Sequence, residues 1–187
     1  MAQQVPAAQE FADYLLCRFV RAAGEVGGRM RMQKAVFLLG AQETPMFVDY
    51  FFHLRGPYSP ALAGTLGYLV NQGLVTEQAE ELAPDILQYS YRLTADGKEV
   101  LRKFEAHPSV RHAVALGKRY EQRFVSLVQR DVRELELAAT VVYWRRLGYG
   151  HEHAVRITAQ LKGAKPACPE FRKAMKIVHE VLGHQEN

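Results

Sequence analysis

The sequence of 187 residues predicts a mainly α fold with a small β-hairpin, in the α+β class, followed by a wholly helical C-terminal region. Apolar residues recur at spacings of three and four through most of the chain, which is the period of amphipathic helices. One run, residues 86–93, instead alternates apolar and polar side chains, the period of a half-buried strand. Hydrophobic residues at 48% and charged residues at 24% exclude a disordered chain.

Two helices are expected at the start of the chain, over residues 8–23 and 29–41. The glycines at 24, 27 and 28 end the first helix, because glycine readily adopts the backbone angles of a helix stop. A β-branched and aromatic run over 48–54 then predicts a short strand. The turn Gly56-Pro57 ends that strand.

A third helix is expected to begin at Pro60 and to end near Gln72. Ser59 provides a hydroxyl N-cap, and proline is favoured at the first helical position. Next come a short apolar segment, residues 74–76, and an acidic loop that holds Glu77, Glu80, Glu81 and Asp85. The alternating strand 86–93 and a helix over 95–105, which Thr94 caps, complete the pattern. This order of elements predicts a winged helix-turn-helix over residues 1–106.

The segment 106–109 is the predicted boundary, and residues 107–187 are predicted to be a helical C-terminal region. Its apolar spacing predicts helices over 110–128, from Val132 to the glycines near 148–150, over 151–161 and over 169–182. Short amphipathic helices need a cover for their apolar faces. We therefore expect this region to pack on the winged helix or on a second copy of the chain. The sequence does not decide between a monomer and a homodimer.

The charge is distributed unevenly, since residues 1–107 sum to −2 and residues 108–187 to +6. A basic C-terminal half can meet an acidic partner, or the two halves can attract one another. The third helix carries no Lys or Arg, and the loop that would form the wing is acidic. A phosphate backbone repels such a surface, because duplex binders need cations that release counterions. We therefore expect a regulatory protein that acts through protein–protein contact.

The alternative function is a DNA-binding transcription regulator that uses the basic C-terminal half. Its candidate surface combines cations with an aromatic side chain able to stack: Arg119, Arg123, Arg130, Arg133, Trp144, Arg145 and Arg146. These residues are spaced along two helices, so a single continuous stripe does not follow from the sequence.

The best local site candidates are Arg55, Tyr58 and Ser59, beside a predicted helix N-terminus. They can hold an anion or a partner carboxylate, or they can simply form a tight strand-to-helix turn. A second cluster at the start of the second helix consists of Arg29, Arg31 and Lys34. It can meet phosphates, or it can be a solvated helix face.

No catalytic motif is present, so we expect no enzyme activity, no cofactor and no metal site. Two cysteines are too few for a disulfide scaffold or a zinc cluster. No apolar run approaches the roughly 20 residues that cross a bilayer, and the N-terminus lacks the basic and apolar regions of a secretory signal. We therefore expect a cytoplasmic protein without membrane contact.

Three stretches resemble one bacterial family: Met32–Leu39, Tyr50–Ser59 with its aromatic-x-x-Arg-Gly-Pro-Tyr-Ser core, and Leu69–Val75. The segments Leu135–Thr140 and Lys165-Pro166 resemble its longer members. The family is the YwgA-like group of largely uncharacterised proteins, related to the Panacea (SocA-like) antitoxin domain. The resemblance implies a winged-helix-like fold without known catalytic activity, and the Panacea relatives suggest a toxin-antitoxin or phage-defence setting.

Overall fold

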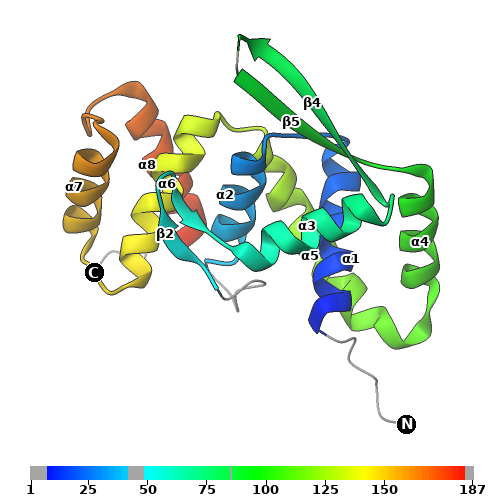
Figure 1. The fold of residues 1–187 in the computed structure, drawn as a ribbon. Helices are drawn as coiled ribbons and strands as arrows, with labels where there is room; N and C mark the ends of the chain where they lie inside the picture. Colours follow the sequence, from blue (N-terminus) through cyan, green and yellow to red (C-terminus); the bar gives the residue numbers. More distant parts are fainter. Residues whose placement is uncertain (1–7, 42–48, 85, 184–187) are drawn as a thin grey trace. The chain divides into compact units, whose positions relative to one another are not determined.

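The structure is a computed structural model that describes residues 8–41, 49–84 and 86–183. The described part is mainly helical with two small antiparallel sheets, which confirms the predicted α+β class. Its elements (Figure 1) are α1 (Ala8–Ala23), β1 (Val26–Gly27), α2 (Arg29–Leu39), β2 (Phe51–His53), β3 (Gly56–Tyr58), α3 (Pro60–Asn71), β4 (Val75–Ala83), β5 (Ile86–Leu93), α4 (Ala95–Ala106), the 3-10 helix η1 (Pro108–Val110), α5 (Arg111–Val128), α6 (Val132–Arg146), α7 (His151–Lys162) and α8 (Pro169–Leu182).

The chain forms two compact units, and each combines segments that are distant in the sequence. The first unit consists of Met1–Met32 and Ala61–Val128, and the second of Gln33–Pro60 and Gln129–Asn187. The predicted boundary at 106–109 lies inside the first unit, where α5 packs against α1. The division into a domain of residues 1–106 and a region of residues 107–187 stays a prediction.

The first unit is built on α1, which packs against α4, α5 and β5. The rings of Phe19 on α1 and Phe124 on α5 stack with their centroids 4.7 Å apart, and both side chains are fully buried. Three antiparallel strands form a sheet in the order β1-β5-β4, in which Val26 pairs with Tyr91. Figure 1 shows β4 and β5 as a long hairpin that extends away from α1 and α4.

The predicted acidic loop after residue 76 is wrong, because most of that segment is part of β4. It pairs with β5 along its length, with Glu77 opposite Tyr91 and Glu81 opposite Leu87. Backbone hydrogen bonds hold this antiparallel ladder together, and the side chains of Glu80 and Glu81 are exposed to water. Asp85 of the predicted loop and Val48 of the predicted strand lie outside the described residues.

The second unit is organised around α6, against which α7, α8 and β3 pack. Every residue of α6 from Glu134 to Val142 is buried, so this helix is the core of the unit. Strands β2 and β3 form a hairpin in which Phe52 pairs with Pro57. At Gly56 (φ 89°) an added Cβ would lie 2.8 Å from Thr140 Oγ1 on α6. Glycine therefore permits both the turn and the close packing of β3 on α6.

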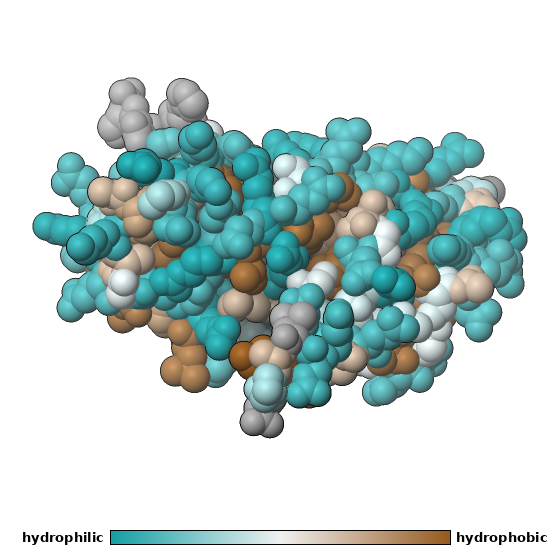
Figure 2. Space-filling model, turned by 90° about the horizontal axis from the view of Figure 1, so that it is seen from above, coloured by the Kyte–Doolittle hydropathy of each residue, from teal (hydrophilic) through white to brown (hydrophobic). Residues whose placement is uncertain are grey.

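Hydrophilic side chains cover most of the molecular face shown in Figure 2, and hydrophobic ones lie between them in small separate areas. The large hydrophobic side chains that are about half exposed include Tyr68, Val100, Ile86 and Leu87. Isolated apolar residues at a surface need no explanation, but apolar residues that gather at a groove mark an interaction site. Tyr68 and Val100 are of the second kind, because both line one groove of the first unit.

Candidate functional site

The three predicted candidates of this segment have different places: Arg55 lies in the β2–β3 turn, Tyr58 ends β3, and Ser59 lies between β3 and α3. The predicted turn at Gly56-Pro57 is wrong, because both residues belong to β3. Ser59 is fully buried, and its backbone exchanges two hydrogen bonds of 2.9 Å with the Gln33 amide. Its hydroxyl donates to Asp49 Oδ1 at 2.6 Å. Tyr58 is half-buried, and its ring lies beside His53 with the centroids 5.7 Å apart, while Arg55 is exposed. The contacts of Ser59 are structural, and Arg55 is the exposed member of the three.

Lys34 is buried at 3% exposure, so the interpretation of its cluster as a solvated helix face is wrong for this residue. Its Nζ donates to the carbonyl of Pro57 at 2.7 Å, beneath the β2–β3 turn. Burial lowers the pKa of Lys34 to about 8, although the nearby Glu136 carboxylate favours the charged form. The sequence missed this burial because lysine is almost never fully buried.

A buried ionic cluster, which the sequence did not predict as a unit, surrounds Glu136 on α6. Lys162 Nζ donates to Glu136 Oε1 at 2.8 Å, and Arg133 Nη1 donates to the other carboxylate oxygen at 2.9 Å. Burial alone would raise the pKa of Glu136, but the hydrogen bonds from Lys162 and Arg133 outweigh it and hold that pKa below its ordinary value. One carboxylate therefore compensates two cations and lies near Lys34.

Lys34→Met tests the burial of this ammonium through the pH dependence of stability. The folded lysine has a pKa of about 8 against 10.5 for the unfolded chain, so between these values the unfolded state binds more protons. The free energy of unfolding of the wild type therefore rises with pH in that window. Relative to Lys34→Met, we expect a gain of about 1 to 2 kcal/mol from pH 7 to 9.5 in urea unfolding. Parallel pH profiles for the two proteins would contradict this burial.

Arg29 and Arg31, in the first unit, are both engaged by their own unit. Arg29 pairs with Glu77 at 2.8 Å and donates to the Tyr91 hydroxyl, and its guanidinium lies 3.9 Å from the centroid of the Tyr89 ring. The hydrogen bond to Glu77 raises the pKa of Arg29 further. Arg31 donates to the carbonyls of Gly27 at 2.9 Å and Val128 at 2.7 Å. Both guanidinium groups therefore already have hydrogen-bond partners within the first unit.

The predicted basic C-terminal face is divided between the two units. Arg119 and Arg123 are exposed on α5 in the first unit, and the other members belong to the second. Arg130 pairs with Glu180 at 3.1 Å. The ring of Trp144 lies among aromatic side chains, 5.2 Å from Phe52 between ring centroids. Most of these side chains therefore serve intra-unit contacts.

A groove of about 610 Å³ lies in the first unit, lined by α1, α3, α4 and η1. The stacked rings of Tyr14 and Phe104, with centroids 4.7 Å apart, form part of its wall. Cys17 also lines it, and burial raises the pKa of this thiol to about 12, which keeps it protonated and unreactive. Tyr68 and Val100, which are 49% and 48% exposed, line the same groove. Neither Tyr68 nor Val100 was selected from the sequence as a site residue. The signal that could have found them is a large apolar side chain on the otherwise polar face of a helix.

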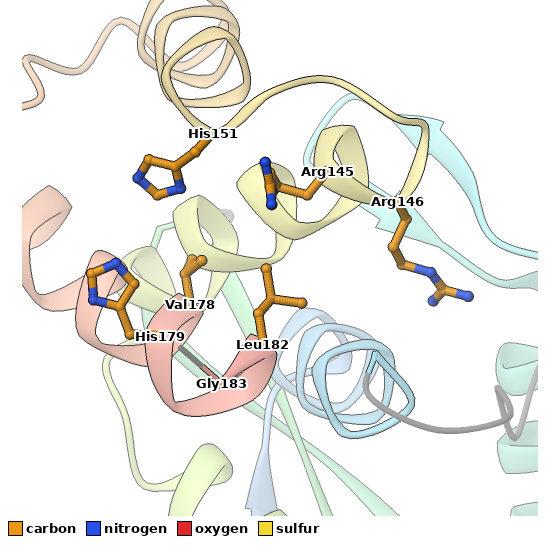
Figure 3. Close-up of a pocket in the computed structure, with 7 residues that line it drawn as sticks. All are labelled: Arg145, Arg146, His151, Val178, His179, Leu182 and Gly183. Atoms are coloured by element: carbon orange, nitrogen blue, oxygen red, sulfur yellow. The ribbon is translucent and has the colours of Figure 1, made fainter. Parts of the chain in front are cut away.

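A smaller pocket of about 140 Å³ lies in the second unit, where the end of α6, the start of α7 and the end of α8 meet. Figure 3 shows Arg145 directed toward His151, with His179 close by on α8, whereas Arg146 points away. The imidazole centroids of His151 and His179 are 6.0 Å apart. Arg146 instead lies 5.5 Å from the centroid of the Phe37 ring.

Among the described residues, no three His, Cys, Asp or Glu side chains gather in a way that could hold a metal ion. No helix in the described part of the chain is both long enough and apolar enough to span a membrane.

No protein-family model matches this sequence. The chain is 27% identical to "Uncharacterized protein YwgA" of Bacillus subtilis (strain 168) over 160 residues, which cover 85% of this chain and 89% of the relative. The relation to the Panacea domain stays a prediction. The similarity to YwgA extends over most of both chains and supports the YwgA-like resemblance of the sequence.

Proposed function

We propose that this chain is a non-catalytic, winged-helix regulatory protein whose first unit binds another protein through the groove between α1, α3 and α4. The observation that carries the proposal is the exposure of Tyr68 and Val100, 49% and 48%, on an apolar groove of about 610 Å³. Exposed apolar side chains that gather at a groove favour a binding surface over an ordinary surface. Tyrosine is also enriched among residues that dominate binding energy.

The partner that fits best is an amphipathic helix with basic residues beside its apolar face. Helices bind proteins by laying such a face into a hydrophobic groove. Glu10 and Asp13 line the groove from α1, and they would attract a basic flank. Lys103, on the α4 side, already pairs with Glu99 at 3.5 Å. Glu10 and Asp13 form no ion pair with a described residue, so the described lining of the groove favours a positively charged partner.

The surface that a winged helix would turn toward DNA favours protein over duplex. α3 contains no Lys or Arg. In the neighbouring hairpin, Glu77 uses Arg29 as its partner, while Glu80 and Glu81 are exposed. These charges oppose the counterion release on which duplex binding depends. If the resemblance to the Panacea domain holds, the bound protein would be a toxin in a toxin-antitoxin or phage-defence system.

Substitutions on the groove test the proposal. Tyr68→Asp and Val100→Asp place a charge in an apolar interface and are expected to weaken partner binding by about 30-fold or more. Leu87→Asp is the matched control, because Leu87 is 54% exposed but lies on β5, away from the groove. Immobilised full-length variants would capture proteins from host lysate, with mass spectrometry for quantification, and calorimetry would then measure the purified partner.

The proposal requires a partner retained by the wild type and Leu87→Asp but lost by both groove variants. Equal capture by all four proteins would overturn the assignment of the groove. Circular dichroism establishes that each variant is folded. Salt-dependent binding of duplex DNA in fluorescence anisotropy, lost in Arg119→Glu/Arg123→Glu and unaffected in the groove variants, would favour the transcription-regulator alternative.

A further inference from the structure

The small pocket of the second unit has the chemistry of an oxyanion site. The polar side chains that line it are two arginines and two histidines, and no described acidic residue lines it. The guanidinium of an arginine offers five hydrogen-bond donors in a planar fork. Within the described part of the chain, the Arg145 guanidinium donates one hydrogen bond, to the carbonyl of Tyr149 at a long 3.5 Å, and forms no ion pair with a carboxylate. Most of its donor capacity is therefore available to a ligand.

Three elements deliver donors to the same space. Figure 3 shows the guanidinium of Arg145 from α6 beside the imidazole of His151 from α7, with His179 from α8 completing the group. α7 begins at His151 without a side-chain cap on its first turn, which adds the partial positive charge of a helix start. An acceptor group placed between the three side chains would meet donors from different directions, as a tetrahedral oxyanion requires.

The neighbouring carboxylates do not neutralise this pocket. Glu180, next to His179 in the sequence, pairs with Arg130 at 3.1 Å. Glu152, next to His151, is exposed and does not line the pocket. Val178 and Leu182 form an apolar wall, and such a wall strengthens the attraction between an anion and the donors. The local balance of charge therefore favours a bound anion.

The volume limits the ligand to one small group. A cavity of about 150 Å³ holds a molecule of the size of benzene, and this pocket is about 140 Å³. We propose that this pocket binds a phosphate group, carried either by inorganic phosphate or by a small phosphate monoester. Arginine suits phosphate because its fork donates two parallel hydrogen bonds to the oxygens. The site lies in the second unit and is independent of the protein-binding groove of the first.

Isothermal titration of the full-length protein with inorganic phosphate and with phenyl phosphate, at constant ionic strength, tests the proposal. We expect saturable binding of one equivalent of at least one probe. Tighter binding of inorganic phosphate would identify the free ion as the ligand, and tighter binding of phenyl phosphate a monoester. Arg145→Gln is expected to weaken binding about tenfold or more, since it removes a charge-assisted hydrogen bond. Arg145→Lys, which keeps the charge without the fork, should fall between the two.

Arg156→Gln is the matched control, because Arg156 is exposed on α7 and does not line the pocket. Amide and imidazole shifts in nuclear magnetic resonance spectra should change around His151 and His179 when phosphate is added. Absence of saturable binding below about 10 mM of either probe would overturn the proposal. So would equal weakening by Arg145→Gln and Arg156→Gln, since that result would indicate non-specific attraction to the basic surface.

Discussion

Gly97→Ala is expected to lower the free energy of unfolding by about 3 kcal/mol or more. An added Cβ at Gly97 would lie 2.1 Å from the carbonyl oxygen of Leu74 and 2.8 Å from Leu93 Cδ1. The Leu74 oxygen cannot easily move, because it accepts hydrogen bonds from the backbone N–H of Thr94 at 3.0 Å and its hydroxyl at 3.1 Å. The substitution must displace α4 or break this cap, and urea unfolding followed by circular dichroism measures the loss.

The same substitution at Gly67 is the matched control. Gly67 lies within α3, and an added Cβ there would have no atom of another element within 4 Å. Alanine has a higher helix propensity than glycine, so Gly67→Ala is expected to raise stability by up to about 1 kcal/mol. A loss of stability in Gly97→Ala together with a gain in Gly67→Ala would establish the close contact of Gly97 with Leu74. A loss below about 1 kcal/mol at Gly97 would contradict that contact.

Glu136→Gln is expected to cost about 3 kcal/mol, because it removes the carboxylate that compensates two cations in the second unit. The Lys162 side chain is only 5% exposed and pairs with Glu136 at 2.8 Å, so its ammonium would stay buried without a counter-charge. The cost arises from the uncompensated lysine more than from the lost hydrogen bonds. Adding Lys162→Met should therefore restore part of the stability, and a double-mutant cycle measures the coupling.

Glu99→Gln is the control for the loss of a carboxylate that pairs with cations at the surface. Glu99 on α4 pairs with Arg102 at 2.8 Å, where water screens both groups. We expect no measurable change in the free energy of unfolding, because water screens an exposed ion pair. A similar effect of the two substitutions would mean that Glu136 is not effectively buried.

The helices of this chain are the part of the fold that local sequence specifies well. The predicted helix 8–23 and the predicted strand 86–93 have the observed bounds of α1 and β5. α3 begins at Pro60, directly after Ser59, as the proline preference predicts. Thr94 caps α4 through a hydrogen bond from the N–H of Gly97. These signals act within one or two helical turns, so distant residues do not alter them.

The candidate sites depend on long-range contacts that no local pattern contains. The two-residue strand β1 exists only because β5 lies beside it. Lys34 and Glu136 are far apart in the chain, and their proximity follows from the packing within the second unit. Arg145 and His179 line one pocket although α7 lies between them in sequence. Spacing rules cannot place such pairs, because those rules describe single elements.

The sequence alone determined the helical periodicity, the stops at glycine, the cap at Thr94 and the absence of cations from α3. Each depends on backbone geometry or on side-chain chemistry within a short stretch of chain. Only the tertiary structure decided which charges are buried, which arginines are occupied, and where the groove and the small pocket lie. These properties arise from the water that packing excludes, and exclusion of water depends on residues brought together from separate parts of the chain.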